Sequence, residues 1–245
     1  MSFLEMKFNS NIDRYKKWRR LGMELNKKLI KEIPKGVFLE AAENLRMVGK
    51  GGNIVSDSED ELSYIMDRAI NDITIEGKRC IELYIDRYGE SSTNNEKELL
   101  NAMKDSYYSL FIVEGIIVGK GLHLIDVFSN ERLFLIDINL SQTAEIGYLI
   151  SSRIISIDNI NFTSGCACIF EEKYLKQLKD NFINLFEKKK HTITWQEMMR
   201  KYNPYFFKMM KQIGIDINFS TVIEKGYFAN KNRRRLNGNG KSGQN

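Results

Sequence analysis

The stretch that decides the fold runs from residue 109 to 170 and contains five short apolar runs separated by turn residues. Residues 109–138 read SLFIVEGIIVGKGLHLIDVFSNERLFLIDI, and residues 148–170 read YLISSRIISIDNINFTSGCACIF. Gly119 and Gly121 flank the first turn, where positive φ angles favour glycine. Strands at such even spacing are typical of a small antiparallel meander that curls or closes into a barrel. The sequence therefore predicts a β-meander or small barrel at the centre of the chain.

Helices are expected on both sides of this stretch. From Asn11 to Ile33, apolar residues recur at three- and four-residue steps, which is typical of a helix with one apolar face. Residues 171–190 repeat that pattern after the last strand. Thr93 and Glu96 have the spacing of a capping box, in which each side chain bonds to the other residue's backbone N–H. The predicted fold class is therefore α+β, with helical segments before and after a mostly antiparallel sheet.

The chain divides into five expected segments. In order, these are an N-terminal helical segment (1–53), an acidic helical segment (54–108), the β-meander or small barrel (109–170), a C-terminal helical segment (171–229) and a disordered basic tail (230–245). The tail is expected to be disordered because it has almost no apolar residue with which to offset its ordering entropy.

The overall composition is that of a soluble globular protein. Hydrophobic residues make up 42% and charged residues 28% of the 245 residues, both in the ordinary range. No apolar run approaches the ~20 residues of a membrane span, and the first residues lack a signal-peptide pattern. Three cysteines, an odd number, do not suggest a disulfide framework. We therefore expect a cytoplasmic protein that does not contact a membrane.

Charge is distributed unevenly along the chain, whose net charge is +5. Residues 11–35 contain nine basic and three acidic residues, whereas residues 54–98 contain twelve acidic and five basic residues. In one interpretation the basic first helix pairs with the acidic stretch around Asp57 to Asp72. In the other, the helix and the basic tail bind nucleic acid or another polyanion. The candidate nucleic-acid-binding residues are Arg14, Lys16, Lys17, Arg19, Arg20, Lys231, Arg233, Arg234 and Arg235.

Histidine and cysteine, which carry much of enzyme chemistry, are few and do not form a known motif. His123 alternates with Leu122 and Leu124 in a predicted strand and so faces away from them, and His191 follows three lysines. The two thiols of 166–168 face the same side of a strand, but no second Cys/His pair completes a zinc site. We therefore expect no cofactor and no bound metal.

Three carboxylates leave one catalytic alternative open. Asp126, Glu131 and Asp137 come from adjacent strands and the turn between them, and if they converged they could hold a divalent metal ion. The chain would then be a metal-dependent enzyme acting on nucleic acid. The interpretation we favour is a non-enzymatic binding or adaptor protein, whose partner is a protein or a nucleic acid.

Several stretches together resemble a bacterial family. They are 96–102 (EKELLNA), 109–113 (SLFIV), 119–127 (GKGLHLIDV), 147–154 (GYLISSRI) and 163–165 (TSG). In these the chain resembles uncharacterised bacterial proteins associated with the SEC-C motif, a short cysteine-rich zinc-binding tail. The resemblance implies an adaptor role for that tail. Here residues 237–243 read NGNGKSG and contain no cysteine, which excludes zinc binding through them.

Overall fold

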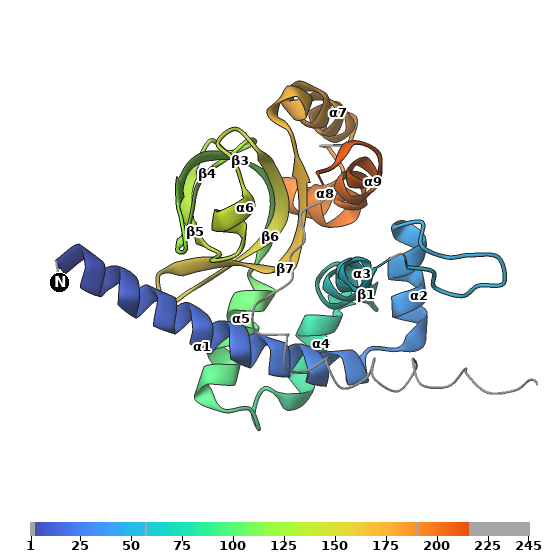
Figure 1. Ribbon diagram of the computed structural model, residues 1–245. Helices are drawn as coiled ribbons and strands as arrows, with labels where there is room; N and C mark the ends of the chain where they lie inside the picture. The colour runs from blue at the N-terminus through green and yellow to red at the C-terminus, as the bar shows by residue number, and fades with distance from the viewer. Residues whose placement is uncertain (1–2, 57, 190, 216–245) are drawn as a thin grey trace, which may run out of the picture.

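A closed five-stranded barrel lies at the centre of the molecule, and helices from both flanks of the chain pack around it (Figure 1). The computed structural model describes residues 3–56, 58–189 and 191–215. The barrel strands are β3 (Tyr107–Ile117), β4 (Gly121–Asp126), β5 (Arg132–Ile136), β6 (Leu149–Ile157) and β7 (Ile160–Phe170). The predicted α+β fold, with helices at both ends and a barrel in the middle, is confirmed.

The strand order is β3-β4-β5-β7-β6, which differs from that of a simple meander. A meander would pair β5 with β6, but β6 pairs with β3 and β7, and the barrel closes through a parallel pair, Leu135 with Asn161. The difference arises at the short helix α6 (Leu140–Thr143), which lies within the outline of the barrel in Figure 1. Leu140 packs into the barrel interior, so the chain crosses one end of the barrel before β6 begins.

The barrel interior is apolar and tightly filled. The buried side chains inside it are Phe111, Val113, Leu122, Leu124, Leu135, Leu140, Ile150, Ile154, Ala167 and Ile169. His123 is exposed between two of them, as the alternation predicts. A Cβ atom at Gly121 would lie 2.0 Å from the carbonyl oxygen of Leu135, so the close approach of β4 to β5 requires glycine there.

The flanking helices pack against the outer side of β3, β6 and β7 (Figure 1). Before it come α1 (Phe3–Glu32), α2 (Lys35–Asn44), α3 (Glu59–Asn71), the hairpin of β1 (Thr74–Ile75) and β2 (Lys78–Arg79), α4 (Cys80–Tyr88) and α5 (Asn94–Lys104). After it come η1 (Glu172–Tyr174), α7 (Leu175–Glu187), α8 (Trp195–Tyr202) and α9 (Pro204–Ile213).

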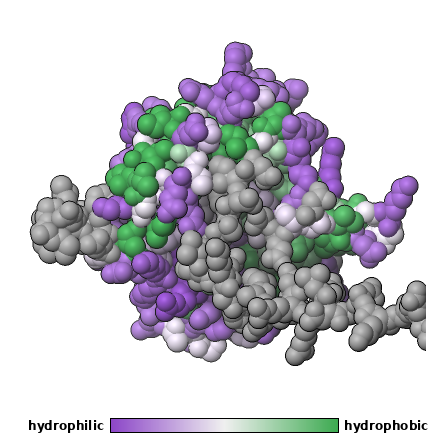
Figure 2. Space-filling view, viewed as in Figure 1, coloured by the Kyte–Doolittle hydropathy of each residue, from purple (hydrophilic) through white to green (hydrophobic). Residues whose placement is uncertain are grey.

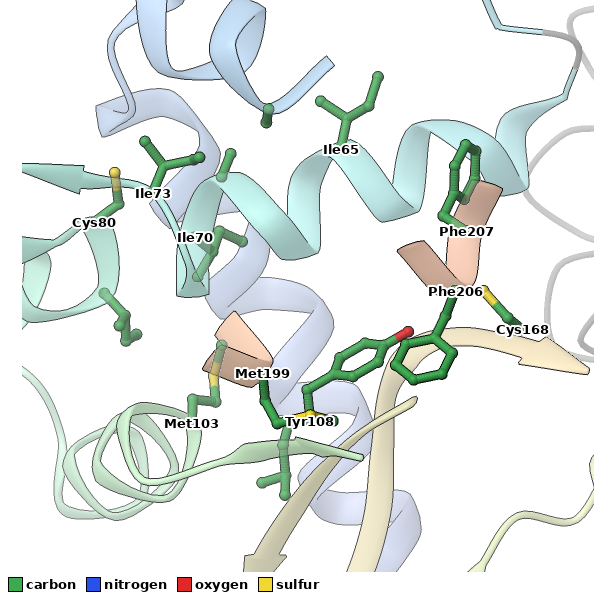
Figure 3. Close-up of a cluster of buried hydrophobic side chains, with 14 of the residues drawn as sticks. Ile65, Ile70, Ile73, Cys80, Met103, Tyr108, Cys168, Met199, Phe206 and Phe207 are labelled. Carbon is green, nitrogen blue, oxygen red and sulfur yellow. The ribbon is translucent and has the colours of Figure 1, made fainter. Parts of the chain in front are cut away.

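Both sets of helices share one hydrophobic core with the outer face of the barrel. Figure 3 shows part of this core, where the ring of Tyr108 from β3 lies beside that of Phe206 from α9, with centroids 6.2 Å apart. Ile65 and Ile70 of α3 are buried in the same core. The described helices and the barrel therefore pack as one structural unit.

Phe182 of α7 is the centre of an aromatic cluster that attaches the C-terminal helices to the barrel. It is fully buried, and its ring centroid lies 5.1 Å from that of Phe206, 5.7 Å from that of Phe128 and 5.8 Å from that of Trp195. Phe128 belongs to the β4–β5 turn, so one side chain connects α7, α8, α9 and the barrel.

Hydrophobic side chains form separate patches on the surface. In Figure 2 they gather over the barrel at the upper left and again at the right near α2, with hydrophilic side chains between and around them. Among the described residues, no helix combines the length and the apolar character that crossing a membrane requires. The predicted disordered tail (230–245), with Lys231 and Arg233–Arg235, lies outside the described residues.

The predicted capping box of α5 is formed, and it makes stability depend on pH. The Glu96 carboxylate accepts hydrogen bonds from Lys28 Nζ (2.7 Å), the Thr93 backbone N–H (2.8 Å) and Thr93 Oγ1 (2.8 Å). These bonds, that of Lys28 first, lower the pKa of Glu96 from 4.5 to about 2. Because the pKa is lower in the folded chain, the stabilisation is complete above pH ~4.5 and is lost as the pH falls towards 2.

We expect Glu96→Gln to flatten the pH dependence of the melting temperature between about pH 4.5 and pH 2. Glutamine keeps the capping geometry but has no charge to titrate. Thermal denaturation at several pH values measures the melting temperature of each protein as a function of pH. Glu90→Gln, at an exposed position, is the control and should follow the wild-type curve. If the melting temperature of Glu96→Gln falls with pH as steeply as that of the wild type, the Glu96 carboxylate does not cause this pH dependence.

Candidate functional site

A cavity of about 140 Å³ lies where α1, α3 and α5 meet the outer face of β6 and β7. We call it the α1–α3–β7 cavity. Part of its wall is apolar, including Ile70 of α3, Leu99 of α5 and Phe162 of β7. Met23 and Gly165, which are exposed, also line it and mark the side that opens to solvent.

Several residues that line this cavity carry a buried polar atom without a hydrogen-bond partner. Five buried side-chain atoms among its lining residues have no hydrogen-bond partner in the part of the chain that the structure describes: Trp18 Nε1, Asn26 Oδ1, Asn71 Oδ1, Arg153 Nη1 and Ser164 Oγ. Trp18 and Arg153 are each 1% exposed, and Asn71 is 3% exposed. A buried polar group without a partner costs ~1–3 kcal/mol, so such groups nearly always have one. Five of the lining residues carry such a group, which singles this cavity out among those of the described residues.

A bulge in β7 shapes one wall of the cavity. Ser152 of β6 pairs with Ala167, and Ile154 pairs with Thr163, so β7 carries extra residues between these two pairs. Gly165, within the bulge, has a φ of +114°, a conformation that other residues rarely adopt. Bulges often lie next to functional sites, because they redirect side chains out of the regular ladder.

Arg153 is held in place by two carboxylates of the acidic segment. Its Nε donates to both oxygens of Asp67 at 3.1 Å, and its Nη2 donates to Asp72 Oδ1 at 2.8 Å. Burial alone would lower the pKa of Arg153, but Asp67 and Asp72 outweigh burial and raise it above its ordinary value. Asn71 Nδ2 donates to the backbone oxygen of Asp67 at 3.0 Å, which leaves Asn71 Oδ1 as an acceptor.

A second arginine completes this network. Arg68 donates to Asn203 Oδ1 at 3.0 Å and to Asn44 Oδ1 at 2.9 Å, and it lies 3.7 Å from Asp72. Asn203 Nδ2 in turn donates to Asp72 Oδ2 at 2.8 Å. Two arginines and two aspartates therefore balance within this network.

The predicted basic residues of α1 have separate partners. Arg14 forms an ion pair with Asp158 (3.4 Å), Lys17 donates to Asn95 Oδ1 (3.0 Å), and Arg19 donates to the Thr163 carbonyl (3.1 Å). Lys16 and Arg20 are exposed.

Of the acidic residues around Asp57 to Asp72 with which this basic cluster could pair, Asp67 and Asp72 have other partners, and Asp57 lies outside the described residues. Asp67 and Asp72 are neutralised from the barrel side by Arg153. The acidic segment meets α1 further along, where Lys28 pairs with Glu96 at 2.7 Å.

The three predicted metal-binding carboxylates do not converge. Asp126 Oδ1 accepts hydrogen bonds from the backbone N–H groups of Phe128 and Ser129 and so stabilises the β4–β5 turn. Asp137 Oδ1 accepts from the Leu140 N–H at the start of α6. Because β4 and β5 are antiparallel, the ends of the two strands, and with them the two aspartates, lie at opposite ends of the barrel. In the described ranges, no group of three His, Cys, Asp or Glu side chains could hold a metal ion.

Asp126 and Glu131 instead line a second, more open cleft of about 500 Å³ between the β4–β5 turn and α8. Arg79 and Arg200 line it as well. Arg79 is engaged with the Lys104 carbonyl (3.0 Å) and Glu82 (2.9 Å). None of the unpartnered buried atoms found in the described residues other than Arg153 Nη1 belongs to a residue of this cleft, so the α1–α3–β7 cavity is the stronger candidate.

Three residues of the cavity were not predicted as site residues, each for a physical reason. Trp18 has the helical spacing of a buried apolar residue, and it is buried, but its indole N–H has no partner among the described residues. Asn71 sits at the end of an ordinary amphipathic helix. Arg153 was the detectable one, because a lone arginine within the apolar run LISSRIISI must be paired when buried.

Comparison with known proteins gives a family and no function. No curated protein and no solved structure matches the chain. A family model described as a family of unknown function, DUF7986, matches residues 9–220, a range that contains every residue of the cavity wall. The resemblance to SEC-C-associated proteins stays a prediction. The chain belongs to the DUF7986 family.

Proposed function

We propose that the protein is a non-enzymatic binding protein that holds a small polar ligand in the α1–α3–β7 cavity. The observation that carries this proposal is that five residues with an unpartnered buried polar atom line one cavity. A ligand in this cavity would contact α1, α3 and the barrel, which is how ligand occupancy could be passed on to an adaptor surface.

The titratable groups of the cavity favour binding over catalysis. Asp67 bonds to Arg153 through both oxygens and is therefore a poor general base. Burial raises the pKa of the Cys166 thiol well above its ordinary value, and a thiol is a weak nucleophile compared with a thiolate. The wall thus offers hydrogen bonds without an activated group.

We expect Gly22→Leu to abolish ligand binding while the fold is kept. Gly22 lies in α1 and lines the cavity, and the atom nearest to a Cβ placed there is 3.8 Å away, so a leucine side chain can enter the cavity. Leucine also has a higher helix propensity than glycine. Equilibrium dialysis against a metabolite mixture, read by mass spectrometry, should show a compound retained by the wild type and not by Gly22→Leu.

Gly36→Leu is the matched control for this experiment. It makes the same change in α2, where a Cβ has no neighbour within 4 Å. It should retain the same compound as the wild type, and both variants should melt at or above the wild-type temperature. An identical set of retained compounds for all three proteins would refute the proposed function.

The second candidate is contact with a nucleic-acid backbone through α1. The observation that favours it is the exposure of Lys16 and Arg20 on a helix whose neighbouring acids on α3 pair elsewhere. Such contact would be independent of sequence and would weaken steeply with salt.

A further inference from the structure

We infer that the open cleft beside α8 is a second binding site, which holds a small ligand by a carboxylate or phosphate group at Arg200. We call it the α8 cleft, and it is the space of about 500 Å³ between the β4–β5 turn and α8. The inference does not depend on a ligand in the α1–α3–β7 cavity. It is carried by an unpaired arginine, by the paired arginines near it, and by the rigid helix on which it lies.

Arg200 differs from the other arginines of the cleft because it has no carboxylate partner among the described residues. Arg79 and Arg153, which also line the cleft, each form an ion pair with at least one carboxylate. The Arg200 side chain is half-buried, and within the described ranges its guanidinium neither donates a hydrogen bond nor lies within ion-pair distance of an acid. The five N–H donors of this guanidinium are therefore not used by the part of the chain that the structure describes.

The surroundings of Arg200 favour an added anion. Burial is the largest cause that lowers the pKa of Arg200, and the charges of Arg79 and Arg153 lower it further. The attraction of Asp72 and Glu82 offsets these causes only in part. Because Arg79 and Arg153 line the same cleft, their influence also places the Arg200 guanidinium on the cleft side of α8. An anion there would offset the repulsion among the guanidinium groups, and it could accept two parallel N–H bonds from Arg200.

The backbone of α8 holds Arg200 in a fixed position. Met198 and Met199, the two residues before it, are buried in the core that the helices share with the barrel. The Arg200 carbonyl oxygen accepts a hydrogen bond from Arg68 Nη1 at 3.0 Å, and α8 packs against β3 (Figure 1). A donor on a rigid element loses little conformational entropy when it binds a ligand, so this placement favours binding.

The cleft also has acidic residues, and they limit the kind of anion that fits. Asp126 and Glu131 line it from the β4–β5 turn, and Asp105 lines it beside Lys104. Burial first, and then the charges of Asp126 and Glu131, raise the pKa of Tyr107 in the same cleft to about 12. These acids would repel a second negative group on the ligand. We therefore expect the cleft to favour a ligand with a single anionic group.

The two tryptophans of the chain allow this site to be measured separately from the α1–α3–β7 cavity. Trp195 lines the α8 cleft, and Trp18 lines the α1–α3–β7 cavity. In a ¹H–¹⁵N correlation spectrum of the full chain each tryptophan gives one indole N–H signal, and Trp195→Phe assigns the two signals. The probes are acetate, inorganic phosphate and pyrophosphate, each added to about 20 mM at an ionic strength kept constant with sodium chloride.

We expect acetate or phosphate to shift the Trp195 signal in a saturable way, with half-saturation at about 10 mM or below, while the Trp18 signal stays in place. The anion that binds more tightly identifies the group as a carboxylate or a phosphate. Pyrophosphate, which has a second negative group, should bind no more tightly than phosphate.

Two variants test the role of Arg200. Arg200→Gln should weaken the binding of the anion about tenfold or more. Lys201→Gln, which removes an exposed positive charge from the next position of α8, is the matched control and should change the affinity less than about threefold. The same spectra show that each variant keeps the wild-type fold.

The inference is overturned if neither acetate nor phosphate gives a saturable shift of the Trp195 signal, if the Trp18 signal moves in its place, or if the two variants act alike. Tighter binding of pyrophosphate than of phosphate would overturn the preference for a single anionic group. None of these results bears on the dialysis comparison with Gly22→Leu, so the proposed function is tested independently.

Discussion

Replacing Arg153 by methionine is expected to lower the free energy of unfolding by about 3–5 kcal/mol. Methionine preserves much of the side-chain volume, but it leaves Asp67 without its counter-ion and Asp72 with Arg68 alone. Asp72 is buried with a 1% exposed side chain, so water cannot replace the lost partner. Urea denaturation followed by circular dichroism measures the change. At the upper end of this range the loss approaches the whole stability of a marginal domain.

Two comparisons make this expectation specific. Arg132→Met removes an arginine from an exposed pair with Glu114 and should cost less than about 1 kcal/mol. Combining Arg153→Met with Asp67→Asn should recover part of the loss, because the uncompensated Asp67 charge disappears with the cation while Asp72 keeps Arg68. A loss of similar size for both arginine variants would show that Arg153 is not the centre of a buried network.

Phe182→Ala is expected to lower the free energy of unfolding by about 3–5 kcal/mol. The substitution empties the middle of the aromatic cluster and removes contacts to the rings of Phe128, Trp195 and Phe206 at once. Tryptophan fluorescence should change as well, because Trp195 loses a neighbouring ring.

Asn184→Ala, at an exposed position on the same helix, is the control and should change stability by less than about 0.5 kcal/mol. If Phe182→Ala were nearly as mild, the C-terminal helices would not be held to the barrel through this side chain.

Local sequence patterns predicted the barrel strands and most helices, because alternation and helical periodicity reflect which side of each element is buried. Strand order was not predictable in the same way. The parallel closure through Leu135 and Asn161 depends on where α6 directs the chain, and no pattern within β5 or β7 encodes it.

The candidate site was predictable only in part. Arg19 was identified by its charge, but the cavity beside it is formed by residues as far apart in sequence as Trp18, Asn71 and Arg153. Each of these fits its own helix or strand, and their relation appears only after folding. The metal hypothesis was wrong because aspartates next to turns accept backbone N–H bonds, as Asp126 and Asp137 both do.

The packing of α1 against β7 has a consequence for the order in which the chain is made. About 140 residues separate Trp18 from Phe162, both of which line the cavity, so a ribosome working at about 5–20 residues per second exposes α1 for about 7–30 s before its β7 partner exists. Contacts with α4 and α5 can form within that interval, but the side of α1 that meets the barrel stays open. The indole N–H of Trp18 and the amide of Asn26 lie on that side. During synthesis these groups bond to water. The exposed side of the nascent helix is therefore less apolar, and it associates less readily with neighbouring chains.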